Sequence, residues 1–279
     1  MTKRLMTLAV ASAFTGSAFA ADVTISGSQE FNYQNANGAT TTELDGVVSI
    51  KASTELSNGW TASADFNIDE EAGNDGGNSL TLAGPFGKLD MGDTSSATDA
   101  IDDVTDWGYA QTTGTDNVDH AVLYTLPQVV SGLTVNASFA ADTNTDSNAG
   151  GSALSAQYDA GFAQVGYGVL DNDDNTEATL MNATFSVAGV NLGYEVYTVT
   201  DASDVDTDDT AMGATYTVGA VTLGYENVTT ESAGTTSADV TAFGVHYAVA
   251  NELTAFVETS EDDKTADSET TTVGVVYKF

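Results

Sequence analysis

The chain has 279 residues, among them 41 Asp and Glu against 6 Lys and Arg, and its formal net charge is −35 at pH 7. Nucleic acid is excluded as a partner, because a protein needs many Lys and Arg to displace the counterions of a polyanion. Cysteine is absent, so disulfides do not stabilise the fold, and the even composition with only 2 prolines indicates a single domain.

Residues 1–20 are predicted to be a cleaved secretory signal peptide. Lys3 and Arg4 precede an apolar run over residues 5–14, and Ala18-Phe19-Ala20 is a cleavage site of the small-residue type. No later stretch approaches the roughly 18 to 20 apolar residues of a membrane-spanning helix, which excludes a helical membrane protein. The mature chain, residues 21–279, would have no arginine and would keep as its basic residues Lys51, Lys88, Lys264 and Lys278.

From residue 22 onward, apolar and polar side chains alternate with the period of a β-strand. In the first segment Val23, Ile25, Phe31 and Tyr33 share one face, and Thr, Ser, Glu and Asn occupy the other. No segment has a convincing helical period. The pattern predicts sixteen strands, over residues 22–34, 48–56, 60–69, 77–85, 88–96, 119–127, 132–142, 152–160, 162–171, 177–188, 190–201, 209–219, 220–230, 237–249, 252–261 and 268–279.

The connections between these strands are predicted to alternate in length. Seven short turns lie at residues 57–59, 85–87, 128–132, 159–161, 188–189, 219–220 and 250–251, with eight longer, acidic loops between them. Short turns on one rim, long loops on the other and one apolar face are typical of an outer-membrane barrel. We therefore predict an all-β fold, a transmembrane antiparallel β-barrel of sixteen strands, closed because a bilayer tolerates no open sheet edge. A soluble all-β sandwich with the same alternation is the alternative.

The C-terminal strand is predicted to close this barrel. Val273, Val275, Tyr277 and Phe279 would face lipid, and the strand would meet Val23 and Ile25 of the first strand. Aromatic residues near strand ends are expected to form two interface girdles. The set comprises Phe31, Tyr33, Tyr124, Phe162, Tyr277 and Phe279.

Two internal stretches and the C-terminus resemble the Gram-negative general porin family of trimeric, sixteen-stranded diffusion channels. Residues 79–96, SLTLAGPFGKLDMGDTSS, resemble the family's fourth and fifth strands with their turn, and residues 120–140, HAVLYTLPQVVSGLTVNASFA, resemble a later strand pair. The resemblance implies an outer-membrane location among lipid and lipopolysaccharide, a homotrimer, and recognition of Tyr277 and Phe279 by the barrel assembly machinery. The resemblance also implies that residues 97–118 are the third loop, which narrows the channel in the family.

The chain departs from the family's pattern in its charges. Asp93 follows Gly92 where the family commonly has Arg, and no arginine is available to face the third loop. The Pro-Glu-Phe-Gly-Gly element common in third loops is also missing. The resemblance therefore does not extend to a constriction with opposite charges on its two sides.

The predicted pore is strongly acidic. The constriction is assigned to Asp99, Asp102, Asp103 and Asp106 with Asp93, Asp65, Lys51 and Lys88, and the lumen wall to Glu30, Glu55, Asp90, Glu195, Glu226 and Glu258. Such a wall concentrates cations and repels anions. We predict passive, cation-selective diffusion of small hydrophilic solutes, although residues 97–118 also fit a solvated surface loop. The alternatives are a substrate-specific or plugged barrel and a soluble, secreted, calcium-binding β-protein.

Enzyme chemistry is not predicted. The sequence has only His120 and His246 as histidines and lacks metalloprotease, nucleophile-elbow and phosphate-loop motifs. No cofactor is expected. Weak divalent cation binding is conceivable in the acidic segments at residues 171–175 and 201–209, but the first lacks the Gly and the terminal Glu of an EF-hand.

Overall fold

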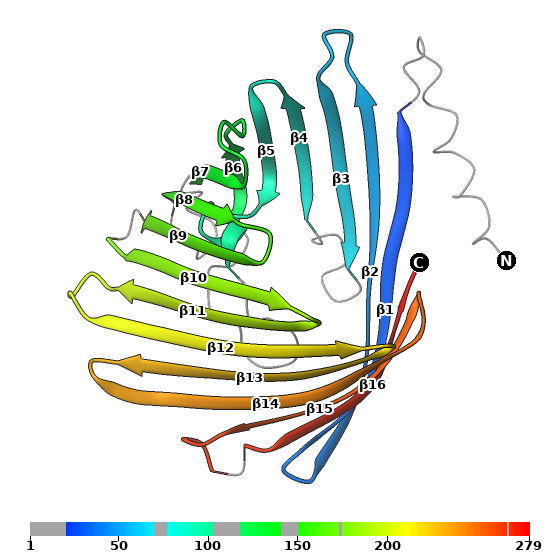
Figure 1. Ribbon diagram of the computed structural model, residues 1–279, viewed down its shortest axis with the longest axis vertical. Helices are drawn as coiled ribbons and strands as arrows, with labels where there is room; N and C mark the ends of the chain where they lie inside the picture. Colours follow the sequence, from blue (N-terminus) through cyan, green and yellow to red (C-terminus); the bar gives the residue numbers. More distant parts are fainter. Residues whose placement is uncertain (1–20, 70–76, 103–117, 141–149, 173–174, 267) are drawn as a thin grey trace, which may run out of the picture.

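The computed structural model describes residues 21–69, 77–102, 118–140, 150–172, 175–266 and 268–279. These residues form sixteen β-strands around one closed barrel (Figure 1), which confirms the predicted fold class. The strands are β1 (Asp22–Ala36), β2 (Ala39–Glu55), β3 (Thr61–Asp69), β4 (Asn78–Gly84), β5 (Gly87–Thr94), β6 (Val118–Thr125), β7 (Leu133–Ala140), β8 (Gly151–Asp159), β9 (Ala163–Asn172), β10 (Glu177–Val187), β11 (Val190–Thr200), β12 (Asp206–Val218), β13 (Val221–Ser232), β14 (Thr235–Ala250), β15 (Leu253–Asp262) and β16 (Thr270–Lys278).

The strands follow one another around the wall in chain order. Each pairs antiparallel with the next, and β1 also pairs with β16, so the sheet closes on itself and the C-terminus lies beside β1 (Figure 1). A single short 3-10 helix, η1 (Asp99–Ile101), follows β5 in the described part of the chain. In that same part, no helix is long and apolar enough to cross a membrane.

The outward face of the wall is apolar and the inward face is polar. Along β1, Val23 and Ile25 are each 63% exposed, whereas Asn32 on the opposite face is only 5% exposed. A soluble sandwich would bury such apolar side chains against a second sheet. Here one closed sheet leaves them on the outside, and a belt of this kind fits a lipid environment.

Aromatic side chains lie toward both ends of this outward face. Phe162, Tyr277 and Phe279 are exposed near the short-turn rim, and Phe31 and Tyr33 are exposed in the half of β1 that leads to the other rim. Their positions are consistent with the predicted pair of girdles.

Two of the eight connections predicted to be long are two-residue turns. Asn37 and Gly38 join β1 to β2, and Ala233 and Gly234 join β13 to β14. All four residues have positive φ, from 50° to 79°, as the type I′ turns of tight hairpins require. The prediction was wrong here because β2 begins at Ala39 rather than at residue 48, and its Thr-rich first part pairs with β1 over its whole length.

The closing seam lies further along β1 than predicted. Val23 and Ile25 pair with β2, whereas β16 pairs with β1 from Ser28 to Ala36. Beyond that ladder, Gly27 N–H donates to the Phe279 carbonyl at 2.9 Å, and Phe279 N–H donates back at 3.0 Å. The Phe279 ring lies over Gly27, because a Cβ added there would be 2.8 Å from Cζ of the ring.

Candidate functional site

The segment after β5 enters the barrel instead of leaving its rim. We call residues 95–102 the third-loop root. Ala97 N–H donates to Ser138 Oγ of β7 at 2.8 Å, and Asn182 Nδ2 of β10 donates to the carbonyl of Ile101. Helix η1 also contacts β8 and β9. The root is thus held on the inner faces of consecutive strands.

Apolar inward side chains form the surface on which the root packs. Ala97 clusters with Leu123 and Ala153, and Ile101 clusters with Ala178, Leu180 and Tyr197. Ile101 is 2% exposed and Leu180 is 0% exposed. Sequence reasoning missed this surface, although apolar residues at inward positions 178 and 180 break the polar phase and were an available signal.

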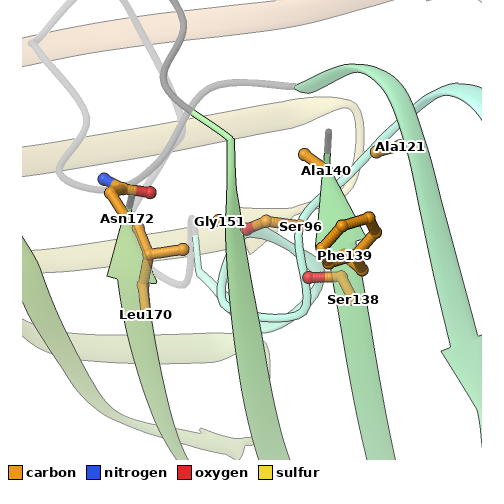
Figure 2. Close-up of a pocket in the computed structure, with 8 residues that line it drawn as sticks. All are labelled: Ser96, Ala121, Ser138, Phe139, Ala140, Gly151, Leu170 and Asn172. Carbon is orange, nitrogen blue, oxygen red and sulfur yellow. The ribbon is translucent and has the colours of Figure 1, made fainter. Parts of the chain in front are cut away.

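The root is ordered by its own hydroxyl groups. Ser96 Oγ and Thr98 Oγ1 are 2.8 Å apart, and Asp99 N–H donates to Ser96 Oγ at 3.0 Å, which starts η1. Figure 2 shows Ser96 and Ser138 beside a small pocket between the root and the wall. The remaining lining residues come from β6 to β9 and are Ala121, Phe139, Ala140, Gly151, Leu170 and Asn172.

The aspartates predicted for the constriction do not all lie in one place. Asp99 lies in η1 and Asp102 directly follows it, so both belong to the root. Asp103 and Asp106 lie outside the described residues. Asp93 accepts the backbone N–H of Asn78 at 2.5 Å and thereby caps the start of β4.

The two predicted wall lysines each lie beside a carboxylate on the inward face. Lys88 Nζ is 2.8 Å from Asp90 Oδ2, and Thr81 Oγ1 donates to the other oxygen of that carboxylate at 2.6 Å. Lys51 stands directly opposite Asp65 in the β2–β3 ladder, and Ser49 Oγ donates to Asp65 at 2.8 Å. Lys88 is therefore ion-paired, and Lys51 stands opposite a carboxylate across the β2–β3 ladder.

Three inward glutamates lie on β11, β13 and β15, whereas the two wall lysines lie on β2 and β5. Glu195, Glu226 and Glu258 are each the sixth residue of their strand, β11, β13 and β15. They are buried, with 0%, 0% and 6% exposure. His246 Nε2 lies 2.5 Å from Glu258 Oε1. We call Glu195, Glu226 and Glu258 the glutamate arc.

The two other predicted wall acids lie apart from this arc. Glu30 accepts a hydrogen bond from Asn32 Nδ2 at 3.3 Å within β1. Glu55 is exposed at the end of β2. The structure therefore divides the predicted wall acids among several strands of the barrel.

The glutamate arc comes from a repeated hairpin sequence. Residues 181–195 read MNATFSVAGVNLGYE, and residues 212–226, which begin 31 residues later, read MGATYTVGAVTLGYE. The repeat places Glu195 and Glu226 at the same height above their turns. An internal comparison of the chain with itself could have found this arrangement.

The acidic segments considered for divalent cations are described only in part. Asp173 and Asp174 lie outside the described residues. In the second segment, Asp206 and Asp208 accept hydrogen bonds from threonine hydroxyls at 2.8 and 2.6 Å. No group of three or more His, Cys, Asp or Glu is arranged to hold a metal within the described ranges.

Comparison with solved structures finds the same barrel in proteins of low sequence identity. A porin refined at 1.8 Å is 19% identical, with a TM-score of 0.75 over 92% of this chain and 100% of that one. The anion-selective porin of Comamonas acidovorans is 14% identical, with a TM-score of 0.76 over 93% and 100%. OmpT of Vibrio cholerae, solved in a trimer form, is 14% identical, with a TM-score of 0.77 over 93% and 99%.

Comparison with family models gives the assignment. None of the curated proteins compared with the chain matches it. The model of the Gram-negative porin family matches residues 7–279, which is nearly the whole sequence. The chain therefore belongs to the Gram-negative porin family and is an outer-membrane channel protein.

Proposed function

We propose that this porin is a passive diffusion channel for small hydrophilic solutes and that it favours cations. The observation that carries the proposal is the charge of the inward face. Carboxylates project inward from β3, β5, β11, β13 and β15, whereas the two wall lysines stand beside carboxylates. A confined space lined by one sign of charge attracts ions of the opposite sign.

The fold itself does not set this preference. The Comamonas acidovorans protein has the same fold and is anion-selective. Selectivity must therefore come from the side chains that face the lumen. The arginine-free mature sequence leaves the acidic wall without the strongest fixed cation, because the guanidinium group stays protonated at every pH of interest.

The reversal potential in a planar bilayer tests the selectivity. With purified protein and a KCl gradient, we expect a reversal potential of the sign that K⁺ permeation produces. We expect the preference for cations to be weaker at high salt, because screening shortens the reach of fixed charges. A reversal potential of the opposite sign would overturn the cation preference. Absence of any conductance would indicate a plugged or substrate-specific barrel.

We further propose that the third loop, residues 97–118, narrows the channel. The root supports this, because residues 95–102 lie inside the barrel against β7 to β10. Liposome swelling with neutral sugars of increasing size measures the limit of permeation. Deleting residues 103–117 should raise that limit, and an unchanged limit would contradict the proposal.

We also propose a homotrimer and a cleaved signal peptide. The trimer is supported by the family and by the trimer form of Vibrio cholerae OmpT. Crosslinking in outer membranes should give a species of three chains, and only a single chain would contradict the trimer. Mass spectrometry of the mature protein should find Ala21 at the N-terminus, and an intact residue 1 would refute cleavage.

A further inference from the structure

We propose that Gly168 and Thr98 form a steric lock that seats the third-loop root and so sets the cross-section of the pore. The inference rests on the proposed channel function and adds two positioning residues to it. Thr98 belongs to the root and is 1% exposed, and Gly168 lies on the inward face of β9 beneath it. Figure 2 shows the neighbouring part of the root, where Ser96 lies beside Gly151 of β8 and Ser138 of β7.

Small residues occupy the wall where the root passes. The sixth residue of β11, β13 and β15 is an inward glutamate, and the sixth residue of β7 and β9 is Ser138 and Gly168. The root contacts both of these smaller residues. The chain therefore carries a small residue at this height where the root passes and a glutamate on the strands beyond it.

The root leaves no room for a side chain at Gly168. A Cβ built on Gly168 would lie 2.8 Å from Thr98 Cγ2, and 3.5 Å from both Thr98 Cα and Ser155 Cβ. Contacts of 2.8 Å between carbon atoms are strongly repulsive, since the optimum is about 3.5–4.0 Å. Gly168 does not have a positive φ, so its backbone would accept other residues. Glycine is required there by the root alone.

The lock lies between two hydrogen bonds that the root makes to the wall. On one side Ser138 accepts the Ala97 N–H, and on the other Asn182 donates to the Ile101 carbonyl. These bonds fix the root along the wall, and the Thr98 contact with Gly168 fixes its distance from the wall. A side chain at position 168 would push the root toward the lumen, which would narrow the channel.

A rescue experiment tests the lock. In Gly168→Ala the new Cβ meets Thr98 Cγ2, whereas Thr98→Ser removes that methyl group and keeps the hydroxyl that pairs with Ser96. We expect G168A to lower single-channel conductance beyond the spread of wild-type channels. We expect T98S alone not to lower conductance, because it removes a methyl group and adds no bulk, and we expect T98S/G168A to regain the conductance that G168A loses.

The possible outcomes separate this inference from the channel function. A wild-type protein without conductance would refute the channel, whereas a conducting wild type and an unchanged G168A would refute only the lock. Folding is checked by heat-modifiable gel migration. If G168A does not fold but T98S/G168A does, the lock is supported. If the double variant conducts like G168A or also fails to fold, Thr98 is not the residue that position 168 must accommodate.

Discussion

Deletion of Phe279 is predicted to weaken the barrel at its closing seam and to leave conductance nearly unchanged. The residue lies on the outward face, so its removal does not alter the lumen. It provides two backbone hydrogen bonds to Gly27, at 2.9 and 3.0 Å, and a ring that covers this glycine. The deletion therefore removes the contacts at the C-terminal end of the seam and leaves the ladder between β1 and β16 in place.

The size of the effect follows from these contacts. Each backbone hydrogen bond contributes about 1 kcal/mol to the free energy of unfolding. Full burial of a Phe side chain contributes about 1.5–3 kcal/mol, and the ring is 51% exposed, so its share is about 1 kcal/mol. We expect a total loss of about 3 kcal/mol, which is roughly two powers of ten in the equilibrium constant.

Urea titration of the folded barrel in lipid vesicles, followed by heat-modifiable gel migration, measures this loss. The matched control is Phe279→Leu, which keeps both backbone hydrogen bonds and an apolar side chain, and should therefore lose less than about 1 kcal/mol. Single-channel recordings of the refolded variants should match those of wild type. A deletion that costs no more than Phe279→Leu would refute the role assigned to the two backbone bonds.

Three further variants test the wall, the root and one turn. Glu226→Gln should move the reversal potential toward zero, whereas Glu252→Gln in the exposed turn before β15 should not, and equal shifts would contradict a role for the glutamate arc. Leu180→Ala should lower the free energy of unfolding in urea by about 2–5 kcal/mol, because Leu180 is 0% exposed beneath the root, and a smaller loss would mean loose packing there. Asn37→Gly should be neutral in the same assay and Asn37→Ala should cost about 1 kcal/mol, because φ is 53° at this residue; equal stability of the two variants would argue against the tight turn.

The strand count could be predicted because each strand carries its own signal. Alternation along Leu192, Tyr194 and Val196 is sufficient to place these residues on the outward face of β11, without knowledge of the rest of the chain. Most predicted strands therefore differ from the observed ones by a few residues at their ends. The same alternation identified the inward carboxylates of the glutamate arc.

The closing register could not be predicted from alternation. A shift by two residues keeps every side chain on its face, so the pattern permits Val23 or Phe31 equally as partners of β16. The observed register depends on where Phe279 fits, and the glycine that admits its ring is Gly27. This contact joins the two ends of the chain, so the alternation of apolar and polar residues within one strand cannot predict it.

The apolar surface beneath the third-loop root was missed because it is built from several strands. Leu123, Ala153 and Leu180 each interrupt the polar inward face of their own strand, but one strand considered alone does not show that these positions meet. They become a single apolar surface only when the strands are side by side. The turn at Asn37 and Gly38 is a different case, because Asn-Gly is the strongest local hairpin signal and was available in the sequence.

The 31-residue hairpin repeat has a consequence for how this wall could have evolved. Duplication or loss of one hairpin changes the number of strands by two, which keeps both chain ends on the same rim and every side chain on its original face. Each added copy would also bring one inward glutamate, as Glu195 and Glu226 show. The circumference of the barrel and the charge of its lumen can therefore grow together by a single genetic event.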